Sequence, residues 1–187
     1  MDLLNVMWCN KILKFNNWRC LFFVLALFFI SVTASAQELK IKATFTLNII
    51  KYIGWTDAQK EGDFVIGVVG KEALSAAIRE QAEGRKFGFQ NIIVRDFSKA
   101  NKISPCQVLY VGENAMYDLL SDKIIQNCGG KGFLLITEDL RALEKGSVVN
   151  FYMDGNSVKF EISQFNATKL DITYNSKLET LASSVQR

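Results

Sequence analysis

Short apolar runs alternate with segments of helical periodicity along the middle of the chain. The run Phe64–Gly70 is almost continuously apolar, and it is followed at helical spacing by Leu74, Ala77, Ile78 and Ala82. A continuous apolar run of this length is typical of a strand buried on both faces, as in a parallel sheet. The pattern recurs in strand-like runs over residues 91–97, 107–112 and 133–137, and in a helical face of Met116, Leu119, Leu120 and Ile124. The alternation predicts parallel strands connected by helices.

The C-terminal third has a different pattern. Val148–Met153 and Val158–Ser163 are strand-like, and Asp154-Gly155 between them favours a hairpin turn because it accepts a positive φ. Residues 41–55 carry apolar side chains at spacings of three and four, which predicts a helix that covers the core. Together these patterns predict an α/β fold, a three-layer sandwich with a mostly parallel sheet and an antiparallel C-terminal hairpin at its edge.

The first 36 residues have the pattern of an export signal rather than of a folded segment. Three basic residues, Lys11, Lys14 and Arg19, precede the apolar run Leu21–Ile30, and Ala34-Ser35-Ala36 supplies the small residues that a signal peptidase requires. The alternative is an uncleaved membrane anchor, which needs about 18 apolar residues, more than this run provides. We therefore predict a signal peptide over residues 1–36, with Met7 as an alternative start to Met1, and one exported domain over residues 37–187.

Composition argues against an enzyme. The chain contains no histidine, which excludes Ser-His-Asp and Cys-His arrangements and removes the commonest metal ligand. No carboxylate constellation stands out, and the Gly67-x-x-Gly70-Lys71 turn lacks the Ser or Thr of a phosphate-binding loop. Without its basic leader the chain is nearly neutral, so charge gives no reason to expect nucleic acid. We predict no catalytic residue, no metal and no cofactor.

Two cysteines, Cys106 and Cys128, remain once the leader is removed. Cys106 begins a predicted strand and Cys128 ends the helix that follows it, so a right-handed crossover places both at the same end of the sheet. A disulfide between them is geometrically possible, and a pair of buried free thiols is the alternative.

The predicted helix, strands and hairpin also occur in an order and at spacings that resemble one family. The matching segments are Lys42–Trp55, Ile66–Gly70, Pro105–Gly112, Leu134–Asp139, Gly146–Phe151, Val158–Ile162, Ser176–Leu178 and Leu181-Ala182. Over about residues 42–184 the chain resembles the YfiR-like periplasmic proteins. The resemblance implies a periplasmic regulator without a catalytic site, which represses a membrane diguanylate cyclase or accompanies a sensor histidine kinase, and which can form a homodimer and carry disulfides.

The chain departs from the family pattern at two places. Thr56 stands where the family has proline after the tryptophan, and Gly67 and Val68 occupy the stretch that usually holds a cysteine near the first strand. A family disulfide that involves Cys106 is therefore lost or re-paired with Cys128.

We predict that the domain acts by binding a protein. Phe151, Glu161, Phe165 and Leu170 are the candidate partner-binding residues, because they lie on or beside the predicted antiparallel edge. The alternative is a small-molecule-binding module that acts through a membrane partner. Its crevice is expected at the carboxyl ends of the parallel strands, near Gly70, Gly112 and Glu138.

Overall fold

The computed structural model describes residues 36–98, 102–112 and 122–187. The chain divides into two units, Met1–Glu38 and Leu39–Arg187, and the second contains the folded domain. The predicted signal peptide lies outside the described residues, apart from Ala36, as do Met116, Leu119 and Leu120 of the predicted helical face.

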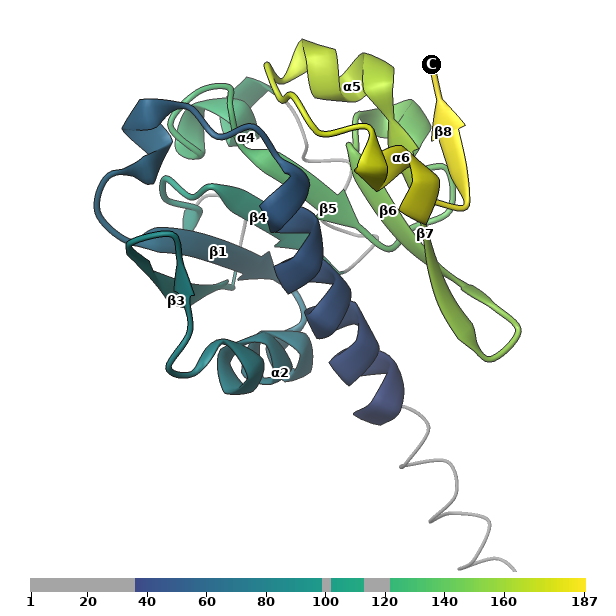
Figure 1. Ribbon diagram of the computed structural model, residues 1–187, viewed down its shortest axis with the longest axis horizontal. Coiled ribbons are helices and arrows are strands. Elements are labelled where there is room, and N and C mark those ends of the chain that lie inside the picture. The colour runs from purple at the N-terminus through teal and green to yellow at the C-terminus, as the bar shows by residue number, and fades with distance from the viewer. Residues whose placement is uncertain (1–35, 99–101, 113–121) are drawn as a thin grey trace, which may run out of the picture. The chain divides into compact units, whose positions relative to one another are not determined.

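One eight-stranded sheet forms the centre of the domain, with the strand order β2-β3-β1-β4-β5-β6-β7-β8. The strands are β1 (Phe64–Val69), β2 (Lys86–Phe87), β3 (Gln90–Phe97), β4 (Val108–Val111), β5 (Leu134–Thr137), β6 (Val149–Asp154), β7 (Ser157–Ser163) and β8 (Ser184–Gln186). The five strands from β3 to β6 are parallel, whereas β2 pairs antiparallel with β3 and β7 pairs antiparallel with β6. The predicted α/β architecture with a mostly parallel sheet is therefore confirmed (Figure 1).

Helices cover both faces of the sheet. Residues 36–49 are helical, and the other helical segments are η1 (Ile50–Tyr52), η2 (Asp57–Lys60), α2 (Glu72–Ala82), α4 (Asp122–Asn127), η4 (Leu143–Lys145), α5 (Gln164–Lys169) and α6 (Lys177–Leu181). The N-terminal helix and α2 share one face, where the Thr44 hydroxyl donates to Gln81 Oε1 over 2.9 Å. Among the described residues, no helix is long and apolar enough to cross a bilayer.

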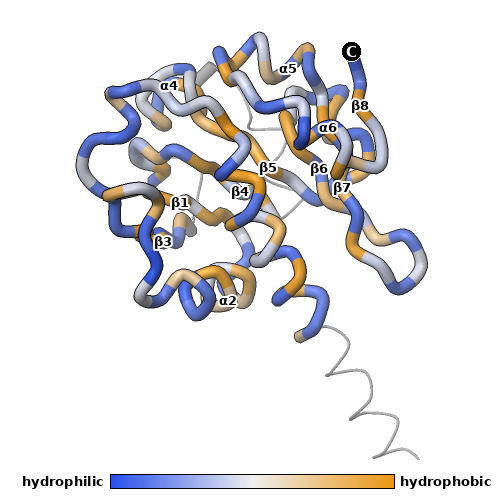
Figure 2. The backbone as a smooth tube through the Cα atoms, in the orientation of Figure 1, coloured by the Kyte–Doolittle hydropathy of each residue, from blue (hydrophilic) through white to orange (hydrophobic). Residues whose placement is uncertain are grey.

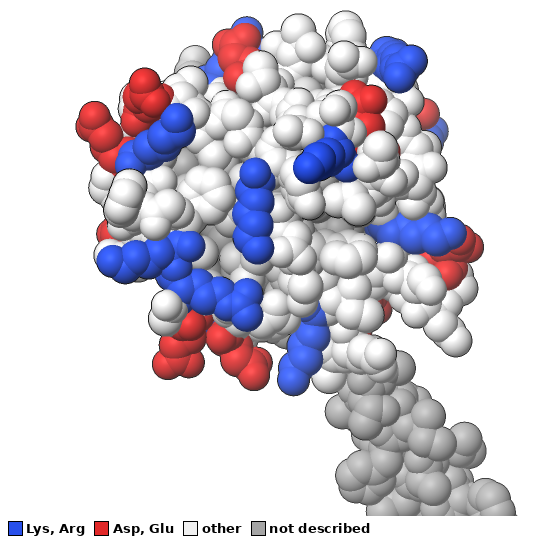
Figure 3. Space-filling view, viewed as in Figure 1, with Lys and Arg blue, Asp and Glu red and all other residues white. Residues whose placement is uncertain are grey.

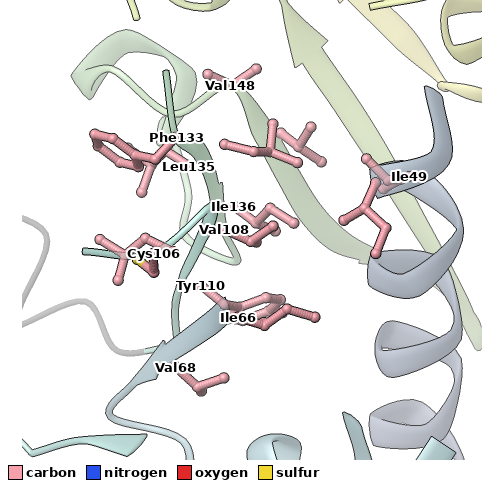
Figure 4. Packing of buried hydrophobic residues seen from close by; sticks show 14 of the residues in the cluster. Ile49, Ile66, Val68, Cys106, Val108, Tyr110, Phe133, Leu135, Ile136 and Val148 are labelled. Atoms are coloured by element: carbon pink, nitrogen blue, oxygen red, sulfur yellow. The ribbon is translucent and has the colours of Figure 1, made fainter. Parts of the chain in front are cut away.

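The core lies between the N-terminal helix and the sheet. Phe45 of the helix packs against Phe151 of β6 and Phe160 of β7, with ring centroids 6.2 and 6.0 Å apart. Figure 4 shows Ile49 of the same helix beside the buried side chains of the central strands, and Figure 2 shows those strands as the most hydrophobic part of the backbone. All six residues of β1 are buried, as a strand covered on both faces requires.

The hairpin and the C-terminus differ in detail from the prediction. Strand β6 extends through Asp154, so Gly155 and Asn156 form the turn, with Gly155 at a φ of 58°. The hairpin is not the edge of the sheet, because β8 pairs in parallel with β7 and forms the last strand. Helix α6 ends at Leu181, and the chain then forms β8 from Ser184.

Segments from the two ends of the domain are hydrogen-bonded to each other. Ile53 and Tyr174 form an isolated antiparallel bridge, and the Gly54 amide donates to the Thr173 carbonyl over 2.8 Å. The Asn175 amide donates to the Tyr52 carbonyl, also over 2.8 Å. The end of the N-terminal helical segment is therefore held by residues more than a hundred positions downstream.

Candidate functional site

The four candidate partner-binding residues fall into two groups. Phe151 is 1% exposed and stacks on Tyr110 with ring centroids 6.0 Å apart, and Leu170 is 4% exposed. Both residues belong to the hydrophobic core, and the ring of Phe151 packs against Phe45 of the N-terminal helix. Neither residue therefore offers a surface to a partner. Phe165 on α5 is 68% exposed, and Glu161 on β7 is half-buried.

A row of polar side chains crosses four neighbouring strands and ends near the C-terminal edge. Thr137, Asn150, Glu161 and Ser184 lie directly opposite one another in register on β5, β6, β7 and β8. We call these four residues the polar row. Side-chain alternation predicts that Glu161 faces away from Phe160, but the sequence does not identify its partners, because they depend on the strand register.

Hydrogen bonds run the length of the polar row. The Thr137 hydroxyl lies 2.9 Å from Asn150 Oδ1, and Asn150 Nδ2 donates to Glu161 Oε1 over 3.0 Å. At the other end the Ser184 hydroxyl donates to Glu161 Oε2 over 3.5 Å. The carboxylate of Glu161 is thus held from both sides in a fixed orientation beside the edge strand.

Helix α5 is fixed so that Phe165 points away from the core. The Ser163 hydroxyl caps the helix by accepting a hydrogen bond from the Asn166 amide over 3.2 Å. The buried side chain of Asn166 donates to the carbonyl oxygens of Leu143 and Ser147 over 2.6 and 2.8 Å. Asn166 thus faces inward, whereas Phe165, the residue before it, is 68% exposed. Helices α5 and α6 both lie beside β8 (Figure 1). Leu181 of α6 is also exposed, at 56%.

A second cluster lies at the carboxyl ends of the parallel strands. Glu138 directly follows β5, its side chain is 6% exposed, and it forms ion pairs with both Lys42 and Lys71. The Tyr110 hydroxyl lies 3.4 Å from Glu138 Oε2. A Cβ at Gly112 would lie 2.6 Å from the Cβ of Lys71, so only glycine permits this packing. The cluster fills the place where sequence alone predicts a ligand crevice. Sequence could not predict the pair of Lys42 with Glu138, because the two residues are 96 positions apart.

The two cysteines meet at the opposite end of the sheet. Cys106 and Cys128 are both buried free thiols, and they line one hollow together with Arg95 and Gln107. A hydrogen bond with Cys128 and burial raise the pKa of the Cys106 thiol above its usual range, against a smaller opposing effect of the backbone of Gly67 and the charge of Arg95. The structure therefore brings these two thiols into contact. Across the described ranges, no group of three or more His, Cys, Asp or Glu residues could hold a metal ion.

Comparisons with known proteins identify one matching family and several solved structures of low similarity. The model of the family described as YfiR/HmsC-like matches residues 39–183. No curated protein matches the sequence. A conserved domain protein of Vibrio cholerae O1 biovar El Tor is similar at 12% identity and a TM-score of 0.49, covering 79% of this chain and 60% of its own.

Two further solved structures are more distant. The ABC domain in complex with L-Trp from Streptococcus pneumonia is similar at 12% identity and a TM-score of 0.44, covering 65% of this chain and 55% of its own. A putative NADP oxidoreductase of Bacteroides fragilis is similar at 16% identity and a TM-score of 0.33, covering 66% and 60%. The chain thus spans less than two thirds of each of these structures. Likenesses this distant carry no argument about ligand or reaction.

Proposed function

Because the chain belongs to the YfiR/HmsC-like family, we propose that it is a periplasmic, non-enzymatic regulator of a membrane-bound signalling enzyme. In this proposal it represses a diguanylate cyclase or a sensor histidine kinase by binding the periplasmic portion of that enzyme. The observation that carries the proposal is the family match over residues 39–183, nearly the whole of the domain. The absence of histidine agrees with a binding role, since it removes the commonest general base.

The surface that we propose for the partner is the C-terminal edge, formed by Glu161, Phe165 and the short strand β8. A regulator changes the state of its partner only if it binds one state more tightly than the other, and a nearly complete shift requires several kcal/mol. An exposed aromatic ring on a fixed helix is the kind of rigid anchor that supplies such a difference, and an oriented carboxylate adds specificity. Phe165 provides the ring and Glu161 the carboxylate.

Affinity capture followed by an activity measurement tests this proposal. The exported chain is immobilised and used to recover membrane proteins from detergent-solubilised membranes of the source organism. We expect to recover a protein with a cyclase or kinase domain, and we expect the chain to lower its activity in native membranes. Recovery of no such protein, or unchanged activity at saturating chain, would refute the proposal.

A matched pair of variants locates the surface. Phe165→Ala removes the ring from α5 and is expected to weaken binding by about thirtyfold, the effect of losing an interface anchor. Leu140→Ala is the control, because Leu140 is 85% exposed but lies in the loop after β5. Equal effects of the two substitutions would place the interface elsewhere.

Association of the chain into a homodimer is a separate prediction. Sedimentation equilibrium of the same preparation tests it.

A second candidate function is a small-molecule-binding module that acts through the same membrane partner. It is favoured by the position of Lys71 and Glu138, because β1 has β3 on one side and β4 on the other, and ligands of such sheets bind where the strand order reverses. Of the two lysines paired with Glu138, only Lys71 keeps part of its side chain exposed, at 28% against 5% for Lys42, so it is the charge that an anionic ligand could reach. A thermal-shift screen with small organic acids tests it, with Lys71→Met as the control, and no stabilisation at saturating ligand would count against it.

A further inference from the structure

Two thiols lie in contact at one end of the sheet, and the proposed regulation makes no use of them. Cys106 stands just before β4, and Cys128 directly follows α4. Both side chains are buried, at 7% and 6% exposure, and they are hydrogen-bonded to each other. Figure 4 shows Cys106 among the buried side chains of the central strands. The pair therefore offers two sulfur ligands at a single point.

Backbone hydrogen bonds hold the segments that carry both sulfurs. The Gln107 amide donates to the Val65 carbonyl over 3.0 Å, which ties the residue after Cys106 to β1. The Cys128 amide donates to the Ile124 carbonyl over 2.9 Å, which continues the hydrogen bonding of α4. Ligands on such supports are already positioned, so an ion can bind them with little rearrangement of the fold.

No third ligand accompanies the two sulfurs. Within the described ranges, no carboxylate or further thiol joins them in a group of three, and the chain contains no histidine. Structural zinc takes four ligands, so two thiols do not satisfy it. Copper(I) is a soft ion that selects sulfur ligands, and two thiolates are enough for it. The prediction of no metal site followed from the lack of histidine, and it does not extend to an ion that needs only two ligands.

The charged side chains around the thiols are balanced in number. Asp63, Arg95, Lys131 and Asp171 border the hollow that the thiols line. Lys131 and Asp171 form an ion pair with each other over 3.8 Å, and Asp63 accepts a hydrogen bond from an asparagine of β3 over 3.3 Å. Basic and acidic side chains are also mixed over the face drawn in Figure 3. Individual charges, rather than a broad field of one sign, therefore decide what the thiols experience.

Arg95 is the cation that acts on the thiol pair. Its guanidinium donates to the Ser104 hydroxyl over 3.4 Å, and no ion pair in the described part of the chain involves it. Its charge lowers the pKa of Cys106, although burial and the hydrogen bond with Cys128 raise that pKa by more. Copper(I) held by two thiolates carries one net negative charge, and a buried charge is costly unless an opposite charge lies nearby. Arg95 supplies that opposite charge.

We propose that Cys106 and Cys128 form a binding site for one copper(I) ion, with Arg95 balancing the charge of the complex. Binding breaks both S–H bonds and forms two S–Cu bonds, the two protons pass to solvent, and copper and sulfur keep their oxidation states. The hollow, of about 610 Å³, gives the ion a path to the sulfurs. A disulfide between the same residues would remove the site, so bound copper(I) and the disulfide exclude each other. This inference goes beyond the proposed regulation and does not depend on it.

Competition with a copper(I) chelator tests the proposal. The exported chain is reduced under nitrogen and titrated with copper(I) in the presence of bicinchoninate, whose copper(I) complex is coloured. We expect one ion per chain. We expect Cys106→Ser and Cys128→Ser each to lower the affinity by at least about a hundredfold, since even a residue that only supports a metal ligand is worth about 10–100-fold. No binding by the wild type, or an affinity that survives both substitutions, would overturn the inference.

Arg95 and Lys131 provide a matched pair of variants. Arg95→Gln removes the charge that acts on the thiols and is expected to weaken copper(I) binding about tenfold. Lys131→Gln removes a cation from the same hollow, but Lys131 is paired with Asp171, so the affinity should not change. Equal losses in the two variants would overturn the role assigned to Arg95.

The wild type also gives a test that needs no substitution. X-ray absorption at the copper edge should show two sulfur neighbours, and an equal concentration of zinc should leave the copper content unchanged. Nitrogen or oxygen neighbours at the copper, or displacement of copper(I) by zinc, would overturn the inference. Failure of the proposed regulation would appear instead in the capture experiment, which uses membranes and no copper.

Discussion

Individual residues explain where this chain departs from the pattern that it resembles. Gly67 lies in β1 directly beneath the ring of Phe97, and a Cβ at this position would stand 2.4 Å from Phe97 Cε2 and 3.3 Å from the sulfur of Cys106. The phenylalanine therefore occupies the space that a side chain at position 67 would need. A cysteine in this stretch of β1 would be within reach of Cys106, but only if Phe97 moved.

We predict that Gly67→Ala destabilises the domain by about 1–3 kcal/mol through overpacking. Combining it with Phe97→Leu should cost less than the sum of the two single substitutions, because the smaller side chain makes room for the new methyl group. Chemical denaturation of the two single variants and the double variant measures this coupling. Additive effects would show that Phe97 is not the obstacle.

The thiol pair predicts a dependence of stability on pH. The pKa of Cys106 is raised in the folded state by its hydrogen bond with Cys128 and by burial. The protonated Cys106 thiol therefore makes its full contribution to the free energy of unfolding below about pH 8.5, where an unfolded thiol is also protonated. This contribution is lost as the pH rises above that value. Under reducing conditions we expect the free energy of unfolding to fall more steeply above pH 8.5 in the wild type than in Cys106→Ser. Equal slopes would contradict the prediction.

We further predict that the same two thiols form a disulfide when a disulfide oxidant such as oxidised glutathione accepts their two electrons. Closing the loop from Cys106 to Cys128 should stabilise the domain by about 3 kcal/mol. Thiol titration under denaturing, non-reducing conditions gives the outcome. Two reactive thiols per chain after oxidation would exclude the bridge, and Cys128→Ser provides the unbridged reference.

At the scale of elements, the N-terminal helix is joined to the sheet by both apolar and charged contacts. Phe45 packs on β6 and β7, and Lys42, whose side chain is 5% exposed, reaches Glu138 at the end of β5. Buried ion pairs of this kind add little net stability, because desolvation offsets much of the attraction. They are costly to break, however, because the remaining charge stays in the interior.

We predict that Glu138→Leu lowers the free energy of unfolding by about 3–5 kcal/mol, since it removes the carboxylate shared by Lys42 and Lys71. Adding Lys42→Met to this variant should restore part of the loss, because the variant then no longer buries that ammonium group. Thermal or urea unfolding of the two variants measures which of them is the more stable. A double variant less stable than Glu138→Leu alone would rule out this account.

The elements that the sequence predicts are those whose pattern is set locally. Strand β1 reads as a buried strand because every position is apolar, and the β6–β7 hairpin is marked by its Asp-Gly step. Strands β2 and β8 are two and three residues long, and neither has a pattern of its own. Their pairing depends on the register of β3 and β7, which no local signal encodes.

The same limit applies to the candidate site. Alternation predicts the face of Glu161 but not its hydrogen bonds to Asn150 and Ser184, which come from neighbouring strands. Phe151 lies on the predicted strand pair, yet its ring completes the core beneath the N-terminal helix. Exposure is a property of the packed layers, so sequence alone could not separate Phe151 from Phe165.

For the whole molecule, the C-terminal edge combines a structural and a proposed functional role. Strand β8 covers β7, and its Ser184 also completes the polar row. We predict that a chain truncated after Ala182 remains folded but exposes the edge of β7 and associates with further copies, because an unpaired edge accepts another strand. Light scattering at increasing protein concentration would show the association, and a monodisperse truncated chain would argue against it.

The hydrogen bonds between Tyr52–Gly54 and Thr173–Asn175 determine when the N-terminal helical segment can complete its contacts during folding. The segment made early in synthesis has no partner until the segment made late has emerged, and β6 and β7, which cover the N-terminal helix, are also late. Contacts of such long sequence separation make folding slow. If the predicted signal peptide directs export N-terminus first, we expect the chain to remain incompletely folded until its C-terminal third has crossed the membrane.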